Sequence, residues 1–183
     1  MSISGQGTLP LTSGFPMLES EYKYLVRSGF DPEGCVRLDI TQAYLTSGGD
    51  NTVRIRKKIG PSGGSFILTV KGPKVGISSV EVELPMSEQT YDQLLPLCGQ
   101  SIVKQRYLVP HMGYTWEVDV FGGSLTGLVV AEVEVRSPKD PCPPAPPSWS
   151  LFDVTTDKRY TNSNLSRLTS SEAKALVRKS IER

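Results

Sequence analysis

Charged residues recur at every second position in several separate segments of the chain. Residues 18–26 read LESEYKYLV, so that Glu19, Glu21 and Lys23 occupy positions i, i+2 and i+4. Successive side chains of a β-strand point to opposite faces, and these three charges would therefore share one face of an extended segment. One such strand is ordinary in a half-exposed sheet. Repetition of the pattern along the chain instead indicates a sheet with one continuous charged face.

Five further segments place like charges two residues apart. They read RIRKK at 54–58, EVE at 81–83, KQR at 104–106, EVD at 117–119 and EVE at 132–134. Lys71 ends another predicted strand, and Lys158 lies in the segment 151–160. The acids of the predicted face are Glu19, Glu21, Glu81, Glu83, Glu117, Asp119, Glu132 and Glu134. The bases are Lys23, Arg54, Arg56, Lys58, Lys71, Lys104, Arg106 and Lys158.

Like charges on one strand face repel each other, and charges removed from water need partners or metal ions. Closing the antiparallel strands into a barrel would point the charged faces at one another and remove the open edges. Internal salt bridges could then satisfy every charge. A ligand of both signs is the alternative: divalent cations on the carboxylates and a polyanion on the bases. Carboxylate oxygens suit Mg²⁺ or Mn²⁺, and Arg and Lys suit phosphate oxygens.

The elements that must position these residues are mainly strands, in an α+β chain. We expect a closed antiparallel barrel with a charged lumen and a few helices packed outside it. The strands are predicted at 18–26, 36–44, 52–59, 65–71, 77–84, 102–109, 114–121 and 128–135. Ser87 is a candidate N-cap for a helix over 88–98, and Thr169 with Glu172 forms a candidate capping box for a helix over 170–182. These helices are expected to cover the apolar faces of the strands.

The length and the net charge of the chain limit its domain organisation and its possible ligands. With 183 residues, we expect a flexible tail over 1–16 and a single domain over 17–183. The 20 Lys and Arg nearly balance the 19 Asp and Glu, which argues against a nucleic-acid surface as the main binding site.

Histidine and cysteine usage excludes further classes of chemistry. His111 is the one histidine and lies in a predicted turn, so that neither a histidine-based nucleophile system nor a multi-histidine metal site is expected. Cys35, Cys98 and Cys142 show no C-x-x-C spacing and are expected to be reduced thiols of a cytoplasmic protein. No apolar run is long enough to cross a membrane.

Taken in order, these segments resemble the CYTH, or triphosphate tunnel metalloenzyme, superfamily. The segments that carry the resemblance are ESEYK at 19–23, RIR at 54–56, LTVK at 68–71, EVE at 81–83, KQRY at 104–107, WEVDVF at 116–121, AEVE at 131–134 and DKRYTN at 157–162. The resemblance implies a closed tunnel of eight antiparallel strands that hydrolyses or cyclises triphosphates with divalent metal. The compact length and the DKRYTN ending look most like the short inorganic tripolyphosphatase branch.

The resemblance also implies roles for individual residues. Those expected to hold metal, two Mg²⁺ or Mn²⁺ ions, are Glu19, Glu21, Asp119, Glu132 and Glu134, with Glu81, Glu83 and Glu117 contributing directly or through water. Those expected to bind the triphosphate are Lys23, Arg54, Arg56, Lys71, Lys104, Arg106 and Lys158. Lys104 and Tyr44 match a pair thought to help activate the attacking water, and the final helix resembles a segment that plugs one tunnel mouth. Lys58 is as compatible with a solvated strand end as with a ligand role.

Two positions depart from the pattern of the short members. Ser79 stands where an arginine is usual, and Leu151 stands where a glycine is usual. The first departure is expected to weaken a phosphate or structural contact, and the second to alter a tunnel mouth and with it the selectivity.

The expected activity is hydrolysis of inorganic tripolyphosphate, with other functions left open. The alternatives are a class IV adenylyl cyclase, a thiamine or nucleoside triphosphatase, and a non-catalytic module that binds polyphosphate. The expected partner is a triphosphate, with no nucleic acid as main ligand, no membrane, and a homodimer left open.

Overall fold

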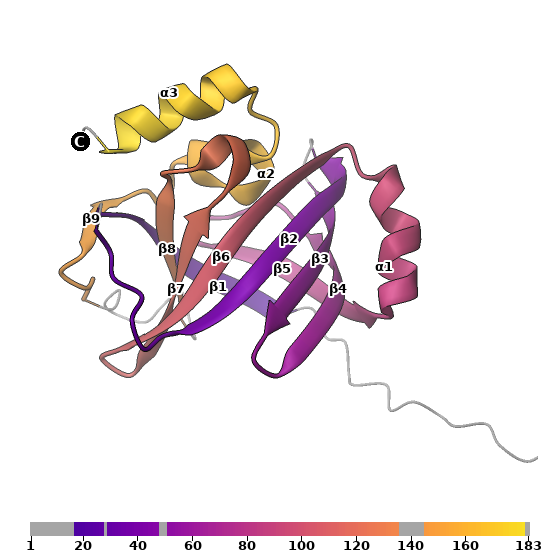
Figure 1. Ribbon diagram of the computed structural model, residues 1–183, viewed down its shortest axis with the longest axis horizontal. Coiled ribbons are helices and arrows are strands. Elements are labelled where there is room, and N and C mark those ends of the chain that lie inside the picture. Colours follow the sequence, from indigo (N-terminus) through magenta and orange to yellow (C-terminus); the bar gives the residue numbers. More distant parts are fainter. Residues whose placement is uncertain (1–16, 28, 48–50, 136–144, 182–183) are drawn as a thin grey trace, which may run out of the picture.

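The computed structural model describes residues 17–27, 29–47, 51–135 and 145–181. Its main feature is an antiparallel sheet in the order β5-β4-β3-β2-β6-β7-β8-β1, which a further pairing of β1 with β5 closes into a barrel (Figure 1). The strands are β1 Met17–Val26, β2 Val36–Ser47, β3 Thr52–Gly60, β4 Gly63–Lys71, β5 Ser78–Met86, β6 Gln100–His111, β7 Tyr114–Phe121 and β8 Val129–Glu134. The predicted closed eight-stranded barrel is therefore confirmed. A ninth strand, β9 Ser150–Asp153, pairs with β1 and was not predicted.

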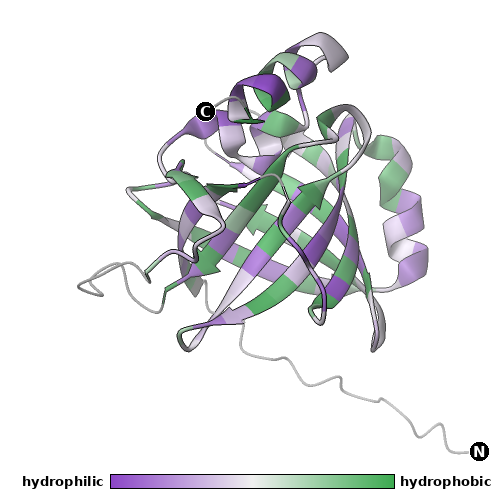
Figure 2. Ribbon diagram, turned by 60° about the vertical axis from the view of Figure 1, so that its left-hand side comes forward, coloured by the Kyte–Doolittle hydropathy of each residue, from purple (hydrophilic) through white to green (hydrophobic). Residues whose placement is uncertain are grey.

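The register of the strands joins their charged faces. Lys23 of β1 pairs with Glu132 of β8, and Glu132 also pairs with Glu117 of β7. Arg106 of β6 pairs with Asp119 of β7. Directly paired residues of antiparallel strands lie on the same face, so these charges all face the lumen. Figure 2 shows the corresponding alternation of hydrophilic and hydrophobic residues along the strands.

One helix, α1 Glu88–Leu94, lies against the outside of the barrel. Its Tyr91 packs on Ala43 and Ile55 of the outer face, and the Ser87 side chain accepts a hydrogen bond from Thr90 N at 3.1 Å. The N-cap is thus confirmed, but the helix ends before the predicted residue 98 and continues as the 3₁₀ helix Leu95–Leu97. Proline in that segment explains the early end, because its ring cannot continue an α-helical ladder.

The C-terminal helices close one end of the barrel. The α3 helix, Ser170–Ile181, lies across this end with α2, Asn162–Leu165, beneath it (Figure 1). Leu176 and Val177 of α3 pack in one cluster with Leu25 and Val130, which continue the lumen-facing positions of β1 and β8. The lumen therefore changes from charged to apolar as it approaches α3.

The N-terminus of α3 has the predicted capping box. Thr169 N donates to Glu172 Oε2 at 2.9 Å, and Glu172 N donates to Thr169 Oγ1 at 3.3 Å. These reciprocal bonds fix where the helix begins.

A third apolar cluster lies on the outer face of β1, β7 and β8. Its central residue, Trp116, is fully buried, and the Trp149 ring packs edge-on against it with centroids 5.8 Å apart. Phe30 packs on Trp149 in turn, at 5.4 Å. Connecting segments cover this face, and the expectation that helices would cover all the apolar faces was wrong here. The reason is that Trp149, with Phe30 packed on it, provides an equivalent apolar cover.

Candidate active site

The centre of the tunnel is organised around the buried guanidinium of Arg106. Its Nε donates to Asp119 Oδ1 at 2.6 Å, and its Nη2 donates to Asp119 Oδ2 at 2.7 Å and to Glu132 Oε2 at 2.8 Å. Its Nη1 donates to Glu117. Burial would lower the pKa of Arg106, but these carboxylates raise it well above its ordinary value. One arginine thus holds three of the predicted acids in place.

Two lysines complete the central network. Lys23 Nζ lies 2.7 Å from Glu132 Oε1, and Lys104 donates to the fully buried Asp119. Burial would raise the pKa of Glu132, but Lys23, Arg106 and Lys104 hold it well below its usual range. Burial and the nearby Arg106 lower the pKa of Lys104 to about 8, although Asp119 opposes this shift. Lys104 can therefore exchange a proton closer to neutral pH than an ordinary lysine.

Two arginines of β3 are paired with the two glutamates of β5. Arg54 Nη2 lies 3.0 Å from Glu81 Oε1, and Arg56 Nη2 lies 2.5 Å from Glu83 Oε1. The Nε atoms of both arginines are buried and make no hydrogen bond within the described part of the chain. A buried N–H donor without an acceptor is costly, and an anion bound beside these two donors would remove that cost.

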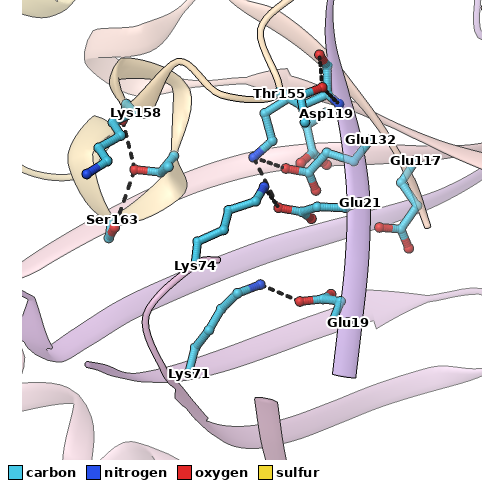
Figure 3. Close-up of polar contacts among 12 residues, drawn as sticks. Glu19, Glu21, Lys71, Lys74, Glu117, Asp119, Glu132, Thr155, Lys158 and Ser163 are labelled. Carbon is cyan, nitrogen blue, oxygen red and sulfur yellow. Dashed lines mark hydrogen bonds and ion pairs between the residues drawn. The ribbon is translucent and has the colours of Figure 1, made fainter. Parts of the chain in front are cut away.

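A second group of pairs lies at the side of the tunnel formed by β1 (Figure 3). Lys71 contacts Glu19, and its Nζ is 3.0 Å from Glu81 Oε2. Burial would lower the pKa of Lys71, but the surrounding glutamates raise it above the ordinary lysine value. Lys74, which the strand pattern did not identify, places Nζ 3.4 Å from Glu21 Oε1.

Glu134 is the predicted acid for which the described residues supply no ion pair, and its carboxylate is close enough to those of Glu19 and Glu117 to be repelled by them. Burial, followed by the charges of Glu19 and Glu117, raises the pKa of Glu134 to about 7. Within the described ranges no three acidic, histidine or cysteine side chains are arranged as they stand to hold a metal ion. The donors nevertheless fit a hard divalent cation, because all are carboxylate oxygens and their mutual repulsion would be relieved by positive charge.

Lys104 and Tyr44, predicted as a pair, make different contacts. Tyr44 is buried and its hydroxyl lies 2.6 Å from Gln42 Nε2, whereas the Lys104 ammonium contacts Asp119 and lies over the Phe121 ring. Both side chains come from lumen-facing positions of neighbouring strands, since Tyr44 and Lys104 lie on β2 and β6. Their joint role in activating water stays a prediction.

Two predicted bases stand apart from the network. Lys158 begins the 3₁₀ helix Lys158–Tyr160, is exposed, and forms no ion pair within the described residues (Figure 3). Lys58 is half-buried at the other end of β3, where burial and the charge of Arg56 lower its pKa. The structure thus brings together seven of the eight acids with six of the bases through direct ion pairs, and the pKa of Glu134 links it to the acids around it.

The two departures from the family pattern lie in different surroundings. Ser79 is buried on β5, between Ser78 and Val80. Leu151 is partly buried and packs against the apolar cluster under α3. Leu151 therefore contributes to the closed end of the barrel.

The sequence patterns did not identify two further residues of the tunnel, Gln42 and Lys74. Gln42 is fully buried at a lumen-facing position of β2, and alternation with Tyr44 could have identified it. Lys74 lies in the connection between β4 and β5, where no strand periodicity applies. Only the proximity of its loop to Glu21 reveals it.

Comparisons with known proteins agree with the tunnel geometry. Residues 17–142 match the CYTH domain model. An inorganic triphosphatase of Acetivibrio thermocellus is 39% identical over 126 residues, which cover 68% of this chain and 77% of that protein. An inorganic triphosphatase of Nitrosomonas europaea is 34% identical over 152 residues, covering 81% of this chain and 97% of that protein. The crystal structure of the inorganic triphosphatase NE1496 superposes with a TM-score of 0.61 at 30% identity, covering 82% of this chain and 95% of that one.

Proposed function

The chain belongs to the CYTH domain family, and from this premise we propose that it is a metal-dependent triphosphatase that hydrolyses inorganic tripolyphosphate to pyrophosphate and phosphate. The observation that carries the proposal is the pair of buried Nε donors of Arg54 and Arg56, which have no acceptor in the described chain and lie in the same tunnel as Glu134, a carboxylate without an ion pair among the described residues. A tunnel that needed only internal salt bridges would have no reason to leave donors of this kind unpaired.

The bases of the tunnel would bind the substrate. We assign this role to Lys23, Arg54, Arg56, Lys71, Lys104, Arg106 and Lys158. Arginine presents several N–H donors in a fixed plane, so that Arg54 and Arg56 can each donate to phosphate oxygens while keeping their glutamate partners. These contacts stabilise the negative charge on the phosphoryl group during transfer, where positioning and electrostatics supply most of the catalysis.

The acids would hold divalent metal, Mg²⁺ or Mn²⁺, with two ions. The proposed ligands are Glu19, Glu21, Asp119, Glu132 and Glu134, with Glu81, Glu83 and Glu117 contributing directly or through water. A bound divalent cation lowers the pKa of water and neutralises phosphate charge. The protein's own contribution is to fix the carboxylates, and Arg106 does this for three of them.

Lys104 and Tyr44 are the groups proposed to assist the attacking water. The pKa of about 8 for Lys104 allows its Nζ to hold or release a proton near neutral pH. The hydroxyl of Tyr44 is oriented by Gln42 and lies beside Arg54 on the neighbouring strand.

The proposal includes a cytoplasmic protein with one domain over residues 17–183. Cys35 and Cys98 are free thiols, which suits a reducing compartment, whereas Cys142 and the segment 1–16 lie outside the described residues. No helix in the described ranges is long and apolar enough to cross a membrane.

The test is phosphate release from tripolyphosphate, ATP, thiamine triphosphate and pyrophosphate, each with Mg²⁺ and with Mn²⁺. We expect the highest kcat/KM with tripolyphosphate. Cyclic AMP formed from ATP would replace the proposal by the cyclase alternative. Binding of tripolyphosphate without release of phosphate would replace it by the non-catalytic binding module.

A further inference from the structure

Lys74 is a tunnel cation that comes from a loop and not from a strand. The loop joins β4 to β5, and backbone hydrogen bonds tie both of its ends to the barrel: Gly72 N donates to Val80 O at 2.9 Å, and Glu21 N donates to Ile77 O at 3.2 Å. The second bond links the loop directly to β1. The position of Lys74 over β1 is therefore set by the backbone on both sides of it.

The side chain of Lys74 is directed inward. Residue 74 has an exposed main chain, but its side chain is only 28% exposed and reaches Glu21, whose side chain is 15% exposed. Figure 3 shows Lys71 and Lys74 extending toward Glu19 and Glu21, which are two positions apart on β1. The loop thus adds a second ammonium beside the one that ends β4.

The ion pair with Glu21 does not by itself explain this arrangement. At 3.4 Å and partly exposed, such a pair contributes little to stability. Glu21 also has a second cation, Lys23, on its own strand at 3.8 Å. Lysine carries three donors on a flexible stem, so Lys74 can leave Glu21 for a more highly charged acceptor without a change in the backbone.

Strand β5, which pairs with β1, supplies no cation to the part of the tunnel near Glu19 and Glu21. The sequence of β5, SSVEVELPM, has no Lys or Arg, and Ser79, which precedes Glu81 by two residues, is buried and neutral. A polyphosphate passing β5 and β1 would meet Glu19, Glu21 and Glu81. Lys71 and Lys74 contact these acids from the end of β4 and its loop, in addition to Lys23 on Glu21 and Arg54 on Glu81.

Resting on the proposed function, we propose that Lys74 is a further substrate-binding residue whose ammonium passes from Glu21 to an oxygen of the bound polyphosphate. The contact forms in the ground state and persists through the reaction, because the loop lies outside the central network of Arg106 and Lys104. Lys74 therefore contributes to affinity for the polyanion more than to the rate of the chemical step.

The test compares Lys74→Met with Lys57→Met. Lys57 is a matched control, since it forms a comparable ion pair with Glu88 at 3.2 Å and its side chain is 35% exposed, but both partners lie on the outside of the barrel. Kinetics with tripolyphosphate and Mg²⁺ give KM and kcat. Thermal unfolding with chelator present, with and without tripolyphosphate, gives a second readout that needs no turnover.

We expect Lys74→Met to raise KM about tenfold, the scale of one charged hydrogen bond, with kcat within about twofold of the wild type. The variant should also show a smaller rise in Tm when tripolyphosphate is added. Lys57→Met should change neither KM nor this Tm shift, and Lys74→Arg should restore the wild-type KM.

A fall in kcat with unchanged KM would show that Lys74 acts only through Glu21 and would overturn the inference. Equal KM values and equal Tm shifts for Lys74→Met and Lys57→Met would also overturn the inference. In that case the proposed function would stand as long as the wild-type protein hydrolyses tripolyphosphate. Absence of that turnover would overturn both.

Discussion

Replacing Arg106 by methionine should destabilise the metal-free protein strongly. The guanidinium is buried and donates to Asp119, Glu132 and Glu117 at once. Methionine keeps much of the length and apolar stem of arginine but none of its donors. The variant would therefore leave carboxylates in the centre of the tunnel without their principal partner.

The loss of stability in Arg106→Met depends on which ion pairs remain around the carboxylates that Arg106 contacts. Leaving a buried charge without its partner costs about 3–5 kcal/mol. Lys23 stays on Glu132 and Lys104 stays on Asp119, so we expect the lower end, about 3 kcal/mol. At about 2–4 °C for each kcal/mol in a domain of this size, Tm should fall by roughly 6–12 °C.

The loss should also depend on pH. Burial would raise the pKa of Glu132, but the cations around it hold that pKa below its ordinary value in the folded protein. Its favourable contribution is therefore complete above the pKa of an unfolded glutamate, about 4.3, and declines as pH falls toward the folded pKa. The difference between wild type and Arg106→Met should be large at pH 7 and shrink below about pH 4.

The assay is thermal unfolding of both proteins with chelator present, over this pH range. Arg37→Met is the control, because Arg37 pairs with Asp39 at 2.7 Å on the exposed outer face and its loss should change Tm little. If Arg106→Met unfolded at the same temperature as the wild type at pH 7, the buried network would not contribute as described.

Three further predictions concern activity. Glu134→Gln should leave Tm with chelator unchanged or higher, because it relieves repulsion from Glu19 and Glu117, yet it should abolish Mg²⁺-dependent phosphate release; a lower Tm with full activity would contradict both parts. Arg54→Ala and Arg56→Ala should each lower kcat/KM for tripolyphosphate by about 10²–10³, the scale of one preorganised electrostatic contact, and unchanged kcat/KM in folded variants would refute a substrate role. Tripolyphosphate should exceed ATP and thiamine triphosphate in kcat/KM under one metal and pH, and a tenfold preference for either of the other two would disprove the expectation.

The barrel could be predicted because its charges alternate strictly along the strands. Positions i and i+2 of a strand share a face whatever their partners are, so Glu19 and Glu21, or Glu132 and Glu134, could be assigned to one surface. The capping box at Thr169 and Glu172 is equally local, and it is confirmed. Patterns that span only a few residues were therefore enough to predict the strands, the C-terminal helix and the side chains that share one face.

What could not be predicted depends on contacts between distant segments. The packing of Trp149 on Trp116 joins residues that are far apart in the chain, and no periodicity signals it. The depth of each strand residue in the tunnel is set by strand register, and this register places Arg106 against three acids. Lys158 lies in a 3₁₀ helix and forms no ion pair among the described residues. Lys74 depends on the path of a loop, which alternation does not describe.

The most direct measurement of the central claim is kcat/KM for phosphate release from tripolyphosphate by the purified wild-type protein, with Mg²⁺ and then with chelator in excess. The tunnel described here predicts turnover with Mg²⁺ and its loss with chelator, while the thermal unfolding transition shows that the protein remains folded. Full turnover by the metal-free protein, or no turnover with any divalent metal, would contradict the claim that this tunnel is a metal-dependent triphosphatase.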